Sequence, residues 1–272
     1  MLNPYYKDDD ITIYHGDCLE IMPQLPEKFI DFILCDLPYG ITACKWDVII
    51  PFDKLWENYK RLIKEDGVIA LFGNEPFSSQ LRISNLKWYK YDWIWDKVNI
   101  SNPFLAKKQP LRCYENISIF YNKKCKYFPQ MISRPNPKFS KEYCRSELYG
   151  GNAIIRSDYS AMYDSWYPKN ILRFSNFDRT NKFHPTQKPV ELCSYLIKTY
   201  TNEGDLVLDN CMGSGSTLIA AKQCNRKAIG IEIDETYCKI AVNRLKYGDA
   251  YNKRPKRIMN ENGLFSEEEY DV

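Results

Sequence analysis

The tetrapeptide Asp36-Leu37-Pro38-Tyr39 directly follows a nearly continuous apolar run. Runs of this kind are typical of strands buried on both faces of a parallel sheet, and open α/β folds bind ligands beyond the carboxyl ends of such strands. The Asp36 carboxylate and the Leu37 carbonyl can accept both N–H bonds of an aromatic amine, which localises the lone pair of its nitrogen. Pro38 restricts the turn, and Tyr39 offers a flat face for stacking. Alone, the tetrapeptide is weak evidence, because Asp and Pro are common in loops.

A second group of suggestive residues lies in the last third of the chain. Asp209 ends an apolar run and is followed by a turn that contains Gly213 and Gly215 and leads into a helical pattern. Glycines at a strand-to-helix turn let the backbone approach a ligand, although a tight turn alone would also require them. Glu232 follows the next apolar run, where a carboxylate can accept two hydrogen bonds from ribose hydroxyls. The spacing therefore indicates a nucleoside site.

The position of Asp209 distinguishes between nucleoside cofactors. A dinucleotide fingerprint needs a third glycine, and Ala220 and Ala221 lie too late in the sequence to replace it. Asp209 would repel a pyrophosphate but suits an ammonium group. Because S-adenosyl-L-methionine carries an ammonium group and no phosphate, the sequence predicts this cofactor.

Strand-like and helix-like segments alternate along most of the chain, which predicts a parallel sheet with right-handed crossovers. Apolar runs predict strands at 11–14, 29–35, 68–72, 91–95, 116–121, 206–209 and 228–232. Helical periodicity predicts helices at 18–25, 52–64, 76–84, 189–200, 216–223 and 235–245.

The segment 122–183 differs from the remainder in charge and composition. It holds 12 Lys and Arg against 5 Asp and Glu, a balance of +7 in a chain whose formal net charge is +3. It also contains 12 aromatic residues. Cations interleaved with aromatic rings suit a nucleic-acid surface, since phosphates bind Lys and Arg and bases stack on rings. A solvated, aromatic-rich subdomain is the alternative.

Composition limits the remaining classes of protein. The ten cysteines are scattered without a Cys-x-x-Cys pair, and there are two histidines far apart in the sequence, so we expect reduced thiols and no metal site. No apolar run approaches the ~20 residues that cross a bilayer. The first residues do not resemble a secretory signal. We therefore expect a cytoplasmic protein without a membrane segment.

Taken together, these motifs resemble those of the β-group amino-DNA methyltransferases, a family with many phage and restriction-linked enzymes that act on adenine N6 or cytosine N4. That group places its Asp-Pro-Pro-Tyr-type motif before its glycine loop, as this sequence does. The resemblance extends to Leu245. Its landmarks are His15-Gly16-Asp17-Cys18, Asp36 to Tyr39, Trp95-Asp96-Lys97, His184-Pro185-Thr186-Gln187-Lys188-Pro189, Asp209 to Thr217, and Glu232.

The resemblance implies an α/β, Rossmann-like S-adenosylmethionine-dependent methyltransferase fold with permuted motif order and an inserted target-recognition region. We expect the catalytic half at 1–121, the target-recognition insertion at 122–183, the cofactor-binding half at 184–248 and a polar, acidic tail at 249–272. The catalytic residues would be Asp36, Leu37, Pro38 and Tyr39. Leu37 stands where the family commonly has proline, a change that keeps the carbonyl.

The resemblance also implies roles at the cofactor. Asp17 would accept the adenine amine, with the Cys18 backbone beside it, and could at the same time serve as a helix N-cap. Lys188 would meet the methionine carboxylate or else support the entry of a helix. The expected cofactor-binding residues are Asp17, Cys18, Asp36, Thr186, Lys188, Asp209, Met212, Gly213, Ser214, Gly215, Ser216, Thr217, Glu232 and Ile233.

Double-stranded DNA is the partner that the resemblance implies. Lys107, Lys108 and Arg112 would contact phosphates. The candidates for reading base edges or holding DNA within the insertion are Arg134, Asn136, Arg145 and Arg173. Asp36, where other members have serine, favours adenine N6, and cytosine N4 stays open. The motifs would also suit an RNA or protein methyltransferase, or a DNA-binding protein whose methylase site has decayed. A homodimer and a cognate restriction endonuclease are further expectations.

Overall fold

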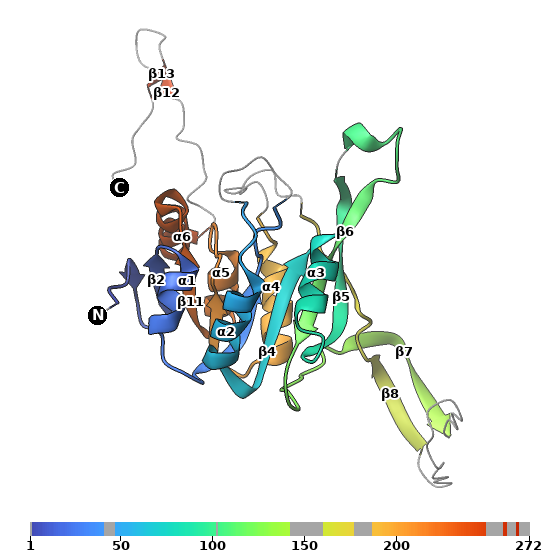
Figure 1. Cartoon of the computed structure of the whole chain (residues 1–272). Helices are drawn as coiled ribbons and strands as arrows, with labels where there is room; N and C mark the ends of the chain where they lie inside the picture. Colours follow the sequence, from blue (N-terminus) through green and yellow to red (C-terminus); the bar gives the residue numbers. More distant parts are fainter. Residues whose placement is uncertain are drawn as a thin grey trace. The chain divides into compact units, whose positions relative to one another are not determined.

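The computed structural model describes residues 2–40, 47–101, 103–141, 160–176, 187–248, 258–259 and 265–266. The chain divides into two compact units (Figure 1). The main unit combines Met1–Tyr127 with Asn170–Val272, and the small unit is Phe128–Lys169.

A nine-stranded sheet forms the centre of the main unit, in the order β1-β2-β11-β10-β3-β4-β6-β5-β9. Neighbours from β2 to β4 run parallel, as the sequence predicts. Its strands are β1 (Tyr6–Lys7), β2 (Ile11–His15), β3 (Ile30–Cys35), β4 (Ile63–Gly73), β5 (Tyr89–Ser101), β6 (Arg112–Phe120), β9 (Ile171–Arg173), β10 (Leu206–Asp209) and β11 (Lys227–Glu232).

The sheet is not wholly parallel. β6 pairs antiparallel with both β4 and β5, and β1 pairs antiparallel with β2. The expectation of a parallel sheet is therefore wrong at these strands. A short connection explains the difference at β6, because an antiparallel strand needs no helical crossover to return from its neighbour.

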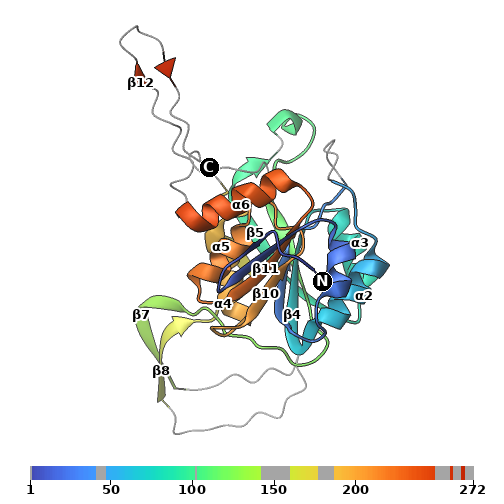
Figure 2. The same ribbon diagram turned by 90° about the vertical axis from the view of Figure 1, so that its left-hand side faces the viewer.

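Helices cover both faces of the sheet, with α1 to α3 on one side and α4 to α6 on the other (Figure 2). Along β3, Phe32 and Leu34 pack toward α4–α6, whereas Ile33 and Cys35 pack toward α1–α3. This alternation is why the strand reads as one continuous apolar run. The helices are α1 (Cys18–Ile21), α2 (Phe52–Leu62), α3 (Phe77–Ser84), α4 (Val190–Tyr200), α5 (Ser216–Gln223) and α6 (Glu235–Tyr247), with 3-10 turns η1 (Met22–Gln24) and η2 (Pro103–Leu105).

The order of the strands places two loops side by side. β3 and β10 are neighbours, with Val207 opposite Phe32 and Leu208 opposite Ile33. From β3 the chain continues to β4 on one side, and from β10 it continues to β11 on the other. The carboxyl ends of β3 and β10 thus form a topological switch point, where open α/β sheets bind ligands.

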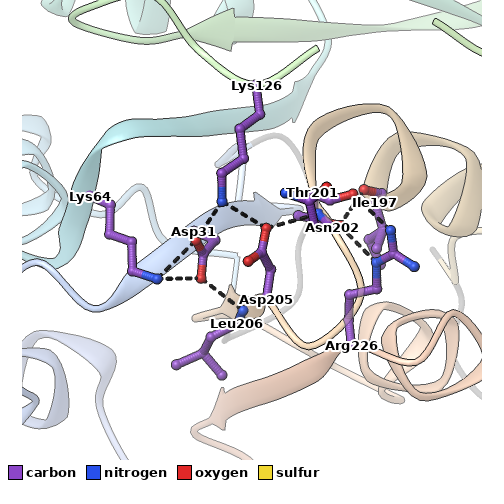
Figure 3. A network of polar contacts seen from close by, with 9 residues as sticks. All are labelled: Asp31, Lys64, Lys126, Ile197, Thr201, Asn202, Asp205, Leu206 and Arg226. Atoms are coloured by element: carbon purple, nitrogen blue, oxygen red, sulfur yellow. Dashed lines mark hydrogen bonds and ion pairs between the residues drawn. The ribbon is translucent and has the colours of Figure 1, made fainter. Parts of the chain in front are cut away.

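A polar network fastens the opposite, amino-terminal edge of the same two strands (Figure 3). Asp31 of β3 accepts hydrogen bonds from Lys64, Lys126 and the Leu206 amide of β10. Lys126 also donates to Asp205, at 2.8 Å. The segment that leads from β6 toward the small unit is therefore tied to the sheet at its amino-terminal edge.

The small unit contains one antiparallel hairpin, β7 (Ile132–Lys141) with β8 (Ser160–Trp166). The insertion expected at 122–183 is longer than this unit, because Ile171–Arg173 joins the main sheet as β9 and Leu172 is buried there. In the expected tail, β12 (Ile258–Met259) pairs with β13 (Phe265–Ser266).

Candidate active site

A cavity of about 450 Å³ opens beyond the carboxyl ends of β3 and β10. The catalytic tetrapeptide and the glycine turn, which are far apart in the sequence, both contribute to its wall. The predicted site residues that line it are Asp17, Cys18, Asp36, Leu37, Pro38, Tyr39, Lys188, Asp209, Met212, Gly213, Ser214, Ser216, Thr217, Glu232 and Ile233.

Asp36 lies at the end of β3, half-buried, with both carboxylate oxygens engaged. The Tyr39 hydroxyl donates to Oδ1 at 2.5 Å, and the Lys188 ammonium donates to Oδ2. Burial raises the pKa of Asp36 above its ordinary value, while Lys188 opposes that shift. The Tyr39 ring packs at 4.9 Å from the ring of Phe77. A carboxylate and an aromatic face therefore stand together on the cavity wall, as the tetrapeptide predicts.

Lys188 has a second carboxylate partner that the sequence did not suggest. Glu115 of β6 lies 3.3 Å from the Lys188 Nζ through its Oε2 atom, and Lys97 of β5 donates to its Oε1 atom. Burial raises the pKa of Glu115, but the two lysines hold it below its ordinary value. Glu115 also lines the cavity. Lys188 directly precedes Pro189, the N-cap of α4, which agrees with the expected helix entry, and its ammonium group also bridges two acidic residues. Its contact with the methionine carboxylate stays a prediction.

One signal could have revealed Lys97 and Glu115 in advance. Trp93, Trp95 and Lys97 share one face of β5 at a period of two residues, and Glu115 alternates in the same way with Ile117 in β6. The register also pairs Trp95 with Glu115. A charged residue that continues the buried face of a strand is a candidate for a buried ion pair.

Asp209 is a buried carboxylate at the start of the glycine turn. Its Oδ1 accepts the Cys211 amide at 3.2 Å, and burial raises its pKa to about 7 despite a hydrogen bond from Thr217. Within the described part of the chain, no Lys or Arg forms an ion pair with it. A buried carboxylate on a cavity wall without a cationic partner is suited to an ammonium group supplied by a ligand.

Glu232 ends β11 and is held by backbone amides. Gly213 donates to Oε2 at 2.8 Å and Asp234 donates to Oε1 at 2.9 Å. Burial raises the pKa of Glu232, which these backbone amides oppose. Each carboxylate oxygen keeps a lone pair for a diol on the cavity side. The chemistry fits the ribose of a nucleoside.

Gly215 does not line the cavity, although it was predicted to bind the cofactor. It caps α5 with φ of 80°, and a Cβ atom there would lie 2.9 Å from the Cβ of Ala241. Its requirement for glycine therefore comes from the left-handed backbone and the close packing of α5 on α6.

Asp17 is the N-cap of α1, and its Oδ1 accepts the Leu19 amide at 2.8 Å. It is exposed and lines the cavity, so its second carboxylate oxygen remains available for a ligand. Hydrogen bonding to Cys211 lowers the pKa of the neighbouring Cys18 thiol, and burial raises the pKa of Cys35 to about 12. Cys18 and Cys211 line the cavity.

Asp209, which has no cationic partner among the residues that the structure describes, fits the methionine ammonium group of S-adenosyl-L-methionine. Glu232, held by backbone amides, fits its ribose, and Asp36 with Tyr39 fits an aromatic amine. The fold and the site define a methyltransferase of the Rossmann-like class. A profile described as DNA methylase, for N6 and N4 enzymes, matches residues 30–243. The chain belongs to this DNA methylase family.

Characterised relatives and solved structures agree with this membership. The chain is 26% identical to the type II methyltransferase M2.LlaDCHI of Lactococcus lactis subsp. cremoris, over 92% of this chain and 95% of the relative. It is 29% identical to the DNA adenine methyltransferase YhdJ of Escherichia coli (strain K12), over 89% and 84%.

Two solved structures show the same fold. The M1.HpyAVI–SAM complex has a TM-score of 0.57 at 24% identity, covering 86% of this chain and 98% of that chain. The cytosine-N4-specific PvuII DNA methyltransferase has a TM-score of 0.62 at 17% identity, covering 94% and 90%.

These findings confirm the predicted family, the Rossmann-like methyltransferase fold and S-adenosyl-L-methionine as the cofactor of this class. The enzyme is a DNA methyltransferase of the N6/N4 type. No helix among the described residues is long and apolar enough to span a bilayer. In the same residues, no cluster of three or more His, Cys, Asp or Glu could hold a metal ion.

The predicted DNA-binding residues are spread over both units. Lys107 and Lys108 are exposed in the connection from β5 to β6, and Arg112, the first residue of β6, is half-buried. Arg173 is exposed and forms an ion pair with Asp96. In the small unit, Arg134 lies over the ring of Trp166 and donates to the Ser165 carbonyl. Arg145 and the cofactor candidate Thr186 lie outside the described residues.

Proposed function

We propose that this enzyme transfers a methyl group from S-adenosyl-L-methionine to the exocyclic N6 amine of an adenine flipped out of double-stranded DNA. The observation that carries the proposal is the half-buried Asp36 carboxylate, which is bound by Tyr39 and lines the same cavity as the cofactor-type residues Asp209 and Glu232. Asp36 at the first position of the motif, and not serine, resembles the adenine-specific members of the family and favours adenine over cytosine.

The chemical step needs a more nucleophilic amine. The exocyclic nitrogen of a base is a weak nucleophile because its lone pair is delocalised into the ring. Asp36 and the Leu37 carbonyl would accept its two N–H bonds, and the amine would replace the Tyr39 hydroxyl at Asp36 Oδ1. The Tyr39 ring would then stack on the flipped base, which offsets part of an unpairing cost of roughly a few kcal/mol.

When bound, the cofactor would supply an electrophilic methyl group on a sulfonium sulfur. The S–CH3 bond would break as the base nitrogen forms the new N–C bond, and the cofactor would leave as a neutral thioether. Once the new N–C bond has formed, the nitrogen carries a positive charge and releases one proton. The Asp36 carboxylate already holds that N–H bond and is the acceptor. Its burial favours the protonated form, so the transfer is suited to this position.

The cofactor would be held by three acidic residues with different tasks. Asp209 would pair with the methionine ammonium group, Glu232 would accept the ribose hydroxyls, and Asp17 would accept the adenine amine. Two observations support these roles. No Lys or Arg among the described residues pairs with Asp209, and backbone amides orient Glu232.

The DNA would meet the carboxyl edge of the sheet through the connection from β5 to β6. β5 runs in the direction of β4, because both are antiparallel to β6. The exposed Lys107 and Lys108 therefore follow a strand that ends at the same edge as the cavity. Contacts of this kind set position and not sequence. The small unit, with Arg134 on Trp166, would add the target-recognition surface.

Methyl transfer to duplex DNA tests the proposal directly. The enzyme, the Asp36→Ala variant and an Asp9→Ala control, which removes an exposed carboxylate outside the cavity, are incubated with methyl-labelled cofactor and DNA. Digestion to nucleosides should place the label in N6-methyladenine for the enzyme and the control, and in no nucleoside for Asp36→Ala. Label confined to N4-methylcytosine would refute the choice of base. Label in RNA but never in DNA would refute the substrate.

A further inference from the structure

Four charged side chains form a continuous chain that ends on the proposed catalytic carboxylate. Lys188 bridges Asp36 and Glu115, and Lys97 binds the remaining oxygen of Glu115. Glu115 is 6% exposed, and Lys97 and Lys188 are each 8% exposed. Two positive and two negative charges balance, so the removal of any one of them leaves a net charge beside the cavity.

The location of Lys188 makes its acidic partners necessary. It precedes Pro189, the N-cap of α4, and the positive end of a helix dipole disfavours a cation there. Burial also disfavours the ammonium form, yet Asp36 and Glu115 raise the pKa of Lys188 above its ordinary value. Apolar residues of similar size would fill the same space at no electrostatic cost. The charges therefore have a use other than packing.

We propose that Glu115 and Lys97 are positioning residues that act through Lys188. They set how strongly the Lys188 ammonium group binds the Asp36 carboxylate before that carboxylate accepts the amine of the base. This inference rests on the proposed function. Lys188 is bound closely to Asp36, and Glu115, at 3.3 Å, shares its positive charge. This sharing weakens the hold of Lys188 on Asp36 and leaves the carboxylate able to accept an N–H bond of the base. Lys97 limits the effect by neutralising Glu115.

Substitutions of the two residues are expected to shift the acid limb of the pH–rate profile of methyl transfer in opposite directions. In Glu115→Gln the full charge of Lys188 acts on Asp36, which keeps the carboxylate ionised to lower pH. In Lys97→Met the uncompensated Glu115 adds negative charge near Asp36, which becomes protonated at higher pH. Each displacement should be about one pH unit, the size that a neighbouring buried charge produces.

The measurement is the single-turnover rate of methyl transfer against pH, with saturating cofactor and DNA, because product release often limits steady-state rates. The double variant Glu115→Gln/Lys97→Met restores charge balance and should return the limb to the wild-type position. Glu65→Gln and Lys123→Met remove the same two charge types from an exposed ion pair and should move nothing. Thermal melts verify that each variant is folded.

Several outcomes would overturn the inference. If Glu115→Gln and Lys97→Met shift the acid limb in the same direction, or lower the rate without moving the acid limb, both residues have only a structural role. If the single variants do not fold, the double variant and Glu115→Asp decide, since both should keep the wild-type limb. A displaced limb in either contradicts the charge argument. A wild-type enzyme that methylates no DNA would instead refute the proposed function.

Discussion

Replacing Asp209 by asparagine tests whether the buried carboxylate binds the cofactor as an anion. Burial raises its pKa from the ordinary 3.8 to about 7. The ionised fraction therefore grows from about one-tenth at pH 6 to about nine-tenths at pH 8. An ammonium group pairs with the ionised form, so cofactor affinity due to Asp209 should rise about tenfold across this range.

The raised pKa of Asp209 also means that its ionised carboxylate destabilises the folded protein when no cofactor is bound. The free energy for holding Asp209 ionised without a cation is roughly 4 kcal/mol, at about 1.4 kcal/mol for each tenfold change in equilibrium. Because the folded pKa lies above the unfolded one, the free energy of unfolding falls as pH rises from about 4 to about 7. Asp209→Asn removes this loss, and a bound ammonium group offsets it.

Calorimetric titration of cofactor into the wild type and into Asp209→Asn at pH 6, 7 and 8 is the assay. The dissociation constant of Asp209→Asn divided by that of the wild type should rise about tenfold from pH 6 to pH 8. The titration of the cofactor amine affects both constants equally and cancels in this ratio. Without cofactor, the melting temperature of the variant should gain roughly 5–10 °C on the wild type between pH 5 and pH 8. A ratio that stays constant with pH would refute the assignment of Asp209.

The remaining predictions concern the base, the ribose and the fold. Tyr39→Ala should slow single-turnover transfer by roughly 10- to 100-fold, through stacking worth ~1–3 kcal/mol, and unchanged turnover would contradict stacking on Tyr39. Glu232→Gln should weaken cofactor binding about tenfold or more and leave DNA binding intact, which calorimetry and gel shift check separately. Gly215→Ala should lower the free energy of unfolding by ~1–3 kcal/mol, because the added Cβ would meet Ala241 and φ is 80°. A melting temperature equal to that of the wild type would contradict this close packing of α5 on α6.

Local sequence was sufficient for the chemistry and for most elements. The apolar run before Asp36 and the glycines after Asp209 predict strand ends and a helix start, because burial and backbone conformation act over a few residues. The family and cofactor followed from these motifs. Asp36, Tyr39 and Glu232 also line one cavity, and their contacts with the base and the ribose stay predictions.

The tertiary structure decided which of these motifs meet. Strand order is set by long-range pairing, so no local pattern shows that β3 lies beside β10 or that β6 reverses direction between β4 and β5. That reversal brings Glu115 to the edge of the sheet where β3 ends, close to Lys188, which precedes α4. The sequence by itself predicted that an acidic residue, Asp36, follows the buried strand β3. Only the fold determined that two lysines and a second carboxylate share its charge, because those side chains come from three separate segments.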